Sequence, residues 1–366
     1  MEPFVYEALP ARVVFGHGTV GQLPDEVARL GCARTLLVAT PQQAQEAERF
    51  AAMLGGRCVG TFVQATMHTP VEVTARAMQV VAERKVDGVV AVGGGSTTGL
   101  SKAIALRSDL PQIIVPTTYA GSEMTPILGE TADGQKKTQR SLKVLPEVVI
   151  YDVDLTLTLP KGLSGTSGLN AIAHAVEGLY ARDTNPIISL MAEEGIGALS
   201  RALPTIAVDP LDQTARSDAL YGAFLCGAVL GAAGMALHHK LCHILGGTFD
   251  LPHAETHAIM LPHALAYNAP AIPRPIARIE RVLGTANAPL RLYELGREVE
   301  APRALKDIGM PEAGIGVAAD LAGQSVLQSG AASTQRDRAL ARARLERLAA
   351  GLTVSGRKQD GDEYVD

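Results

Sequence analysis

The sequence predicts an α/β domain with a parallel, doubly wound sheet, followed by an all-helical domain. Short β-rich runs alternate with helix-forming stretches in the first part of the chain. After Leu159-Pro160 such runs nearly vanish, and Ala-, Leu- and Gly-rich stretches with helical periodicity take over. The alternation is typical of a parallel sheet with helices on both faces. We therefore predict a Rossmann-like α/β domain over residues 1–157, an all-helical domain over 158–351 and a polar tail over 352–366.

The elements of the first part follow one another in a regular order. RTLLVAT is a buried-strand run, and Pro41 and a helix-forming stretch to Leu54 come after it. VDGVVAVGGGSTTGLSKAIAL predicts a strand, a glycine turn and a helix to about Leu106. A polar, hairpin-like segment covers 133–143. The expected strands are 34–40, 88–92, 112–118 and 148–152.

Composition excludes several classes of protein. The 366 residues are 47% hydrophobic and 19% charged, with a formal net charge of −5, as in an ordinary soluble globular protein. Neither nucleic acid nor an anionic membrane is an expected partner at this charge. MEPFVYEALP has no signal-peptide pattern, and the four cysteines are scattered as in reduced proteins. We expect a cytoplasmic protein that acts on a small molecule.

Two loops predict a nucleotide site. In VVAVGGGSTTG, a buried strand runs through three glycines into a helix, so that backbone N–H groups and the positive end of the helix dipole can meet a phosphate. PTTYAGSE follows the next strand, and the two loops would share the crevice where such sheets bind nucleotides. Thr40 stands where strict NAD enzymes often have an acidic residue, so both NADH and NADPH are expected cofactors. The candidate cofactor-binding residues are Thr40, Gly94, Gly95, Ser96, Thr97, Thr117, Thr118 and Ser122.

Histidines predict the chemical site. Six of the nine histidines lie between His238 and His263. His239 and His243 are spaced i,i+4 on one helix face, Asn170 and His174 form a second such pair, and His253 follows a turn. For His257 or His263 alone, we expect a buried ring whose nitrogens are satisfied by backbone carbonyls. His238 is expected to point outward.

These motifs resemble the iron-containing alcohol dehydrogenase superfamily. The resemblance runs from FGHG to about Gly309 through GGGS, PTT–GSE and HxxxH–LGG–PH–LPH. It implies a dehydroquinate synthase-like architecture, a homodimer and a catalytic helical domain. In metal-dependent members an Asp and three His hold a divalent ion. Those positions are Asn170, His174, His239 and His253 here, with His243 as the nearby catalytic histidine that is not a ligand.

Two departures refine the resemblance. Asn170 replaces the metal carboxylate, and Gly99 replaces the acidic residue usual in GGGSxxDxAK. Three imidazoles and an amide should hold Fe²⁺ or Zn²⁺ weakly. Both departures, with PTTYAGSEMTPILGET, ALHHKLCHILGG and FDLPHAETHAIMLPHALAYN, resemble the maleylacetate reductase branch. That branch implies a bacterial enzyme of aromatic-compound degradation, in the β-ketoadipate pathway, that works without added metal.

The chemistry of that branch suits a site without a metal. Hydride from a nicotinamide adds to the conjugated C=C of maleylacetate, and the charge moves to the ketone oxygen as an enolate that imidazole donors can stabilise. The product is 3-oxoadipate. We expect His243 and His253 to be proton donor and enolate stabiliser, in either order, while His174 and His239 shape the pocket.

A dicarboxylate substrate also calls for polar partners. The cationic candidates near the motifs are Lys102, Lys137, Arg140, Lys143, Arg182 and Lys240, each of which can equally be a solvated surface charge. Tyr119 and Tyr267 are candidates for carboxylate hydrogen bonds or half-buried core aromatics.

Three other functions compete with this hypothesis. A metal-dependent alcohol or polyol dehydrogenase would need tight metal binding despite Asn170. A lyase that uses NAD only transiently, as dehydroquinate synthase does, would need a Lys/Arg cluster around a phosphate. A non-catalytic nucleotide-binding module would leave the histidine cluster without a purpose.

Overall fold

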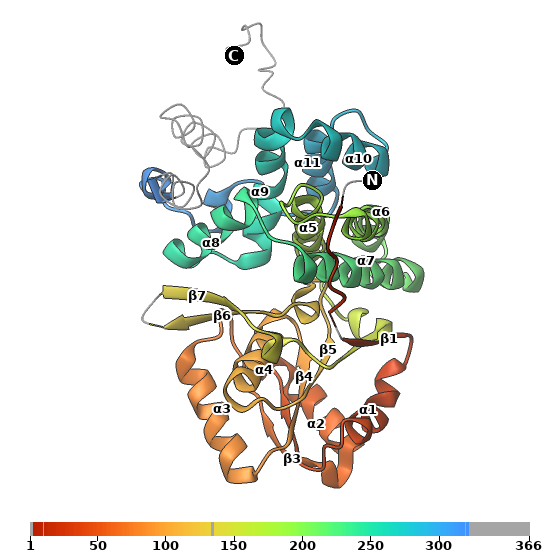
Figure 1. Cartoon of the computed structure of the whole chain (residues 1–366), viewed down its shortest axis with the longest axis vertical. Helices are drawn as coiled ribbons and strands as arrows, with labels where there is room; N and C mark the ends of the chain where they lie inside the picture. The colour runs from red at the N-terminus through yellow and green to blue at the C-terminus, as the bar shows by residue number, and fades with distance from the viewer. Residues whose placement is uncertain (1–2, 10, 133–134, 319, 322–366) are drawn as a thin grey trace, which may run out of the picture.

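The computed structural model describes residues 3–9, 11–132, 135–318, 320 and 321. Within these residues a parallel six-stranded sheet forms the first part of the chain, and helices form the rest (Figure 1). In spatial order the strands are β1 (Arg12–Gly16), β8 (Val148–Asp152), β5 (Gln112–Pro116), β4 (Gly88–Gly93), β2 (Thr35–Val38) and β3 (Cys58–Phe62). The predicted fold class is confirmed.

Helices cover both faces of this sheet. Their bounds are α1 (Leu23–Arg29), α2 (Ala44–Leu54), α3 (Val71–Arg84) and α4 (Gly95–Ser108). Leu37 and Val90 pack in one core with α1 and α2, while their neighbours Leu36 and Val89 pack in a second core with α3 and α4. Because the strands are buried on both faces, their sequences are continuous apolar runs.

All four predicted strands are present, and two strands were not predicted. RVVFG and CVGTF form β1 and β3, the two edges of the sheet. Edge strands are covered less completely, so their sequences carry glycine and lack the long apolar run of a central strand. The predicted hairpin begins earlier than expected, with β6 (Ile127–Ala132) antiparallel to β7 (Gln135–Arg140).

The second part is helical throughout its described residues. The helices are α5 (Lys161–Gly178), α6 (Pro186–Val208), α7 (Gln213–Ala232), α8 (Leu237–Phe249), α9 (His253–Asn268), α10 (Pro273–Leu283) and α11 (Ala288–Glu298). α5 is buried from Ser164 to Gly178 because α6, α7 and α9 pack around it. The predictions for the helical domain beyond residue 321 and for the tail lie outside the described residues.

Close backbone contact joins the two parts. Gly121 has a φ of +79°, and a Cβ on Gly227 of α7 would overlap the backbone of Gly121. The loop after β5 therefore lies directly against the helical layer. The β6–β7 hairpin lies at the same junction, with β7 in contact with α8 (Figure 1).

In the described residues no single helix is long and apolar enough to cross a membrane. α7 and α8 meet the length and composition test only as a pair, with a bend of 96° between them.

Candidate active site at the junction of sheet and helices

The carboxyl ends of β2, β4 and β5 form a crevice with linked polar side chains. Thr40 Oγ1 donates to Gln43 Oε1 at 3.1 Å, and Gln43 Nε2 donates to Thr117 Oγ1 at 3.2 Å. The backbone N–H of Thr117 donates to the Gly93 carbonyl at 3.0 Å. Three loops far apart in sequence are thus held together. Sequence reasoning missed Gln43, whose place three residues after Thr40 was the available signal.

The glycine turn leaves room for a ligand at one position. A Cβ on Gly94 would lie 2.9 Å from the methyl carbon of Thr118, whereas a Cβ on Gly95 meets nothing within 4 Å. Gly95 is also the first residue of α4, a helix of 14 residues. Thr97 Oγ1 donates to the Gly94 carbonyl at 2.8 Å and supports the turn. Open space over the first N–H groups of a helix suits a phosphate.

Some of the predicted cofactor-binding residues lie around the crevice, and Ser122 lies farther from it. Ser96 is half-buried in the first turn of α4 beside this open space. Ser122 lies farther along the second loop, and its Oγ has no hydrogen-bond partner among the described residues. The residues joined around the crevice by contact or hydrogen bond are Thr40, Gly94, Thr97, Thr117 and Thr118.

The neighbours of Gly99 explain why a residue without a side chain suits this position. A Cβ at this position would overlap Thr69 Oγ1, from the loop before α3. Thr69 itself has a left-handed φ of +47°, an unusual conformation for threonine. An acidic side chain at position 99 would therefore require Thr69 to move.

Replacing Gly95 by valine is expected to weaken cofactor binding without unfolding the protein. The new side chain would fill the open space over the start of α4. We expect the Kd for NADH to rise about tenfold or more, a loss of about 1.4 kcal/mol. Fluorescence titration with NADH measures this, and thermal unfolding checks the fold. Gly162→Val, which also meets open space in the first turn of α5, is the matched control. Unchanged NADH affinity in Gly95→Val would place the phosphates elsewhere.

A line of buried side chains crosses the junction from the second loop to α8. His174 Nε2 lies 3.1 Å from the Ala120 carbonyl oxygen, and His174 Nδ1 lies 2.7 Å from His239 Nε2. His239 Nδ1 donates to Glu177 Oε2 at 2.6 Å. Burial lowers the pKa of His174, and it lowers the pKa of His239 to about 3, so both rings are neutral at pH 7. The Ala120 carbonyl and the Glu177 carboxylate can only accept, so the two ring protons lie in these contacts, and the two nitrogens that face each other, His174 Nδ1 and His239 Nε2, both carry lone pairs.

Glu177 anchors the start of α8. Its carboxylate accepts hydrogen bonds from the backbone N–H groups of Ala236 at 2.9 Å, His238 at 2.8 Å and His239 at 3.3 Å. An anion at a helix N-terminus also meets the positive end of the helix dipole. Sequence reasoning missed Glu177, although it lies one turn after His174 on the same helix face.

His243 and His253 lie on the open side of the cluster. His243 is exposed and His253 is half-buried, and their rings are stacked with centroids 6.5 Å apart. The His243 ring is 6.3 Å from that of His239, one turn before it on α8. All four predicted catalytic histidines therefore lie in one cluster, and His263 is half-buried farther along α9.

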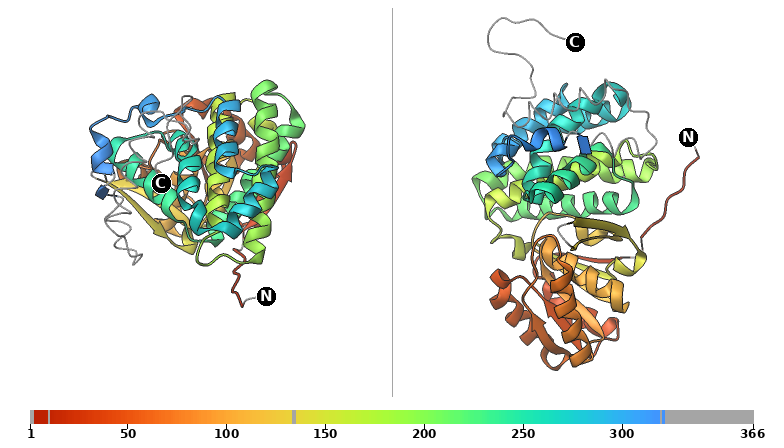
Figure 2. Two further views of the ribbon diagram at one scale, coloured as in Figure 1. Left: turned by 90° about the horizontal axis from the view of Figure 1, so that it is seen from above. Right: turned by 90° about the vertical axis from the view of Figure 1, so that its left-hand side faces the viewer.

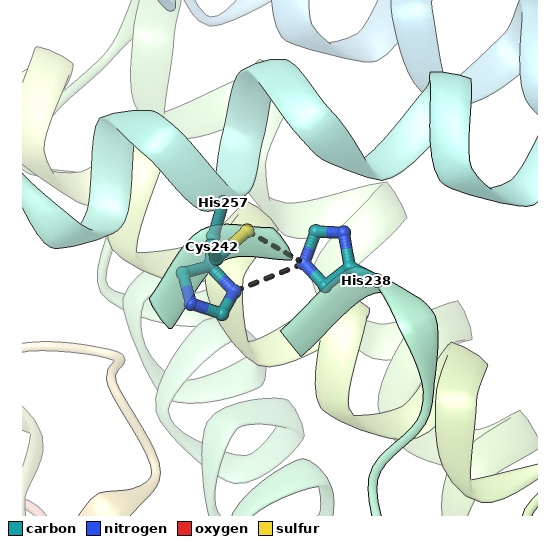
Figure 3. A group of neighbouring side chains, drawn as sticks. All are labelled: His238, Cys242 and His257. Atoms are coloured by element: carbon teal, nitrogen blue, oxygen red, sulfur yellow. Dashed lines mark hydrogen bonds between the residues drawn. The ribbon is translucent and has the colours of Figure 1, made fainter. Parts of the chain in front are cut away.

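Two expectations about single histidines are wrong. His238 does not point outward but is 1% exposed. His257 is buried as expected, but its partner is a side chain rather than a backbone carbonyl: its Nδ1 lies 2.9 Å from His238 Nε2 (Figure 3). His257 Nε2 has no partner among the described residues. The sequence does not show this contact because it joins two helices, α8 and α9, across a turn.

Two of the four positions that the resemblance assigns to a metal, His174 and His239, would have to move apart to hold one ion. His174 Nδ1 and His239 Nε2 are 2.7 Å apart, whereas two imidazole nitrogens on one tetrahedral ion are about 3.3 Å apart. Asn170 Oδ1 is buried without a partner and carries no charge. The described His, Cys, Asp and Glu side chains whose ligand atoms do converge within 4.8 Å are instead His238, Cys242 and His257.

The structure buries Lys102 and Tyr119, and both side chains have hydrogen-bond partners within the protein. Lys102 is buried, and its Nζ donates to the carbonyl oxygens of Ser122 and Thr125, each at 2.6 Å. Burial lowers its pKa to about 7. Tyr119 is also buried, and its hydroxyl accepts from Arg216. The remaining candidates are exposed or half-buried: Lys137, Arg140, Lys143, Arg182, Lys240 and Tyr267.

Known proteins resemble this chain over nearly its whole length. Residues 10–153 match the family model for iron-containing alcohol dehydrogenases, and residues 164–341 match the model for the C-terminal part of that family. A maleylacetate reductase of Sphingobium indicum is 57% identical over 87% of this chain and 90% of its own length. A maleylacetate reductase from a Rhizobium species is 55% identical over 88% of this chain and 92% of its own length. The crystal structure of a maleylacetate reductase from Agrobacterium tumefaciens superposes with a TM-score of 0.89 at 50% identity, covering 96% of this chain and 99% of the other.

Proposed function

The chain belongs to the iron-containing alcohol dehydrogenase family, and from that premise we propose that it reduces maleylacetate to 3-oxoadipate with NADH or NADPH. The observation that carries the reaction is 57% identity to a maleylacetate reductase over 87% of the chain. The site agrees with this chemistry, because it offers a cluster of neutral imidazoles beside the nucleotide crevice.

The reaction adds a hydride and a proton across the conjugated C=C. When bound, the nicotinamide supplies the hydride to the alkene carbon remote from the ketone. The charge that reaches the ketone oxygen is then stabilised by imidazole N–H donors, and a proton goes to the carbon next to the ketone. The described geometry supports His243 as the proton donor, because an exposed imidazole can regain its proton from water. His253 is left as a stabiliser of the enolate.

We propose that no metal takes part. Direct carbonyl reduction localises charge on one oxygen, where a Lewis acid helps most, whereas an enolate spreads its charge and can be held by hydrogen bonds. The exchange of the family carboxylate for Asn170 supports this, since the amide removes the one anionic ligand. Glu177 accepts from His239 Nδ1–H and fixes the orientation of that ring.

Deuterium transfer from C4-deuterated NADH tests the proposed reaction. With metal-depleted protein and maleylacetate, we expect oxidation of the cofactor and deuterium on the product carbon next to the distal carboxylate, measured by NMR. Deuterium on a carbinol carbon would show carbonyl reduction instead and favour the alcohol dehydrogenase. Activity that is lost after chelation and returns with Fe²⁺ would contradict the metal-free mechanism while keeping the substrate.

The proposal includes a homodimer in the cytoplasm. The N-terminal segment reaches past the outline of the helices in one view (Figure 2), its Val5 carbonyl accepts from Asn185 Nδ2 at 3.2 Å, and it carries exposed apolar side chains at Phe4, Val5 and Tyr6. Neighbouring exposed apolar side chains suit contact with a second copy. Sedimentation equilibrium of the full chain, compared with Val5→Lys, tests the dimer.

A further inference from the structure

The second loop, which runs from Pro116 to Glu123, carries parts of both the cofactor crevice and the histidine line. Thr117 accepts a hydrogen bond from Gln43 in the crevice at 3.2 Å. Three residues later, the carbonyl oxygen of Ala120 lies 3.1 Å from Nε2 of His174. Because one short segment meets both the crevice and a catalytic histidine, its conformation affects both.

Lys102 holds the far end of this loop. It lies on α4, two turns after Gly95 and therefore on the same helix face. Its Nζ donates to the carbonyl oxygens of Ser122 and Thr125, each at 2.6 Å. Thr125 Oγ1 at 2.9 Å and the carbonyl oxygen of Ile127 at 3.0 Å complete the set. An ammonium has three N–H donors, so all of them are used within the protein.

The helical part holds the same segment from the other side. Arg216 of α7 is buried and donates to the Tyr119 hydroxyl at 3.0 Å. A Cβ on Gly231, also on α7, would lie 2.5 Å from the Met124 carbonyl oxygen. Lys102 supplies the matching contact from α4. The loop is thus held between the helix whose first turn opens on the crevice and the helical part of the chain.

The charge of Lys102 is buried at a cost. Its side chain is 1% exposed, and the loss of water lowers its pKa to about 7. The buried carboxyl of Glu123 acts against this shift, and it accepts from the Tyr151 hydroxyl at 2.7 Å. Farther along α4, Arg107 pairs with Glu130 of β6 at 3.0 Å. Buried charges are weak contributors to net stability, so the loop conformation that Lys102 specifies is the better explanation of its contacts.

We propose that Lys102 is a positioning residue, which fixes the second loop to α4 in the conformation that cofactor binding and His174 both require. In that conformation Thr117 lines the crevice, and the Ala120 carbonyl lies against the His174 ring. Lys102 acts through the loop rather than by contact with the cofactor or the substrate. The expected effect on kcat rests on the proposed reduction of maleylacetate, whereas the expected effect on NADH binding does not.

A purely structural role is the other explanation of the same contacts. In that case, loss of Lys102 would lower thermal stability without changing the NADH affinity of the folded molecules. Ile104 gives the matched comparison, because it is completely buried on the same helix and packs only in the apolar core under the sheet. Ile104→Ala should destabilise the protein through the cavity that it creates, and leave the Kd for NADH within about twofold of the wild-type value.

NADH titration of Lys102 variants tests the proposal. Lys102→Met keeps the length of the side chain without its donors. We expect it to raise the Kd for NADH about tenfold or more and to lower kcat with maleylacetate about tenfold, because small displacements of positioning groups have large effects on rate. In Lys102→Ala, added propylammonium should restore NADH binding. Propanol, which has the same length but no charge, should not.

The pH dependence of NADH binding adds a result that a structural role does not predict. The ammonium donates three hydrogen bonds and the neutral amine only two, so loss of the proton loosens the loop. Since the pKa of Lys102 is about 7, the Kd should rise about threefold or more between about pH 6 and pH 9 in the wild type, and not in Lys102→Met. Glu123→Gln should keep this rise and move it to lower pH, because the carboxylate no longer favours the ammonium.

The outcomes separate the proposal from its alternatives. A folded Lys102→Met with lowered Tm but wild-type NADH affinity and kcat would overturn it. So would equal rescue of Lys102→Ala by propanol, since filled space rather than charge would then hold the loop. If neither variant folds, an NADH affinity of the wild type that is the same at pH 6 and pH 9 overturns it. Absence of maleylacetate turnover, with NADH binding that depends on Lys102 as expected, would overturn the proposed function alone.

Discussion

Glu177→Ala is expected to lower the free energy of unfolding by about 4 kcal/mol or more and to remove activity. Three backbone N–H groups at the start of α8 and the His239 ring all donate to this one buried carboxylate. Each buried donor that loses its acceptor costs about 1–3 kcal/mol. Without Glu177, the first turn of α8 and the orientation of His239 are both lost.

Thermal unfolding and kinetics measure this effect. A loss of about 4 kcal/mol lowers the Tm of a chain of this size by about 5 °C. Glu298→Ala is the control, because its partner Arg291 forms an exposed ion pair on α11 that contributes about 1 kcal/mol at most. Glu177→Gln keeps one acceptor oxygen but turns an amide N–H toward donors, so an intermediate loss is expected. A Tm within about 2 °C of the wild type would show that water replaces the carboxylate.

Asn170→Asp is expected to destabilise the metal-free protein and to create tight metal binding. Asn170 is 2% exposed and its Oδ1 has no partner among the described residues. A carboxylate there would be buried without a cation, which costs several kcal/mol or forces it to take up a proton. A divalent ion would relieve this cost and draw the rings of His174 and His239 apart to coordinate it.

Thermal shift with added Fe²⁺ or Zn²⁺ measures the change. An ion at 100 times its Kd stabilises the folded protein by about 2.7 kcal/mol. We expect that stabilisation in Asn170→Asp at ion concentrations that shift the wild-type protein little. Asn287→Asp is the control, because Asn287 caps α11 and aspartate caps a helix equally well. Equal metal response in Asn170→Asp and the wild type would show that position 170 does not face the ion.

Much of the fold could be predicted because the central strands have a clear sequence pattern. β2, β4, β5 and β8 are buried on both faces, so each is a short run of apolar residues ended by glycine, proline or a polar residue. β1 and β3 could not be predicted in the same way. Their pairing on one side only leaves their side chains partly exposed, and the sequence signal weakens accordingly.

In the candidate site, contacts within one helix could be predicted and contacts between elements could not. Regular spacing predicted the pairs that share one helix face, Asn170 with His174 and His239 with His243. Contacts between elements had no such spacing: Gln43 to Thr117 joins two loops, and Glu177 to His239 joins two helices. The contact between His257 and His238 likewise joins two helices and has no sequence signal.

The sequence by itself determined the fold class, the family and the set of residue types available for chemistry. Local patterns suffice for these, since apolar periodicity and motif order are properties of neighbouring residues. The tertiary structure alone decided how those residues are used. Which nitrogen of a histidine carries the proton, whether a carboxylate caps a helix, and whether Gly99 has room for a side chain all depend on what lies opposite in space. Hydrogen bonds and steric overlap act through distance, and distances between α5, α8 and α9 exist only after the helices have packed.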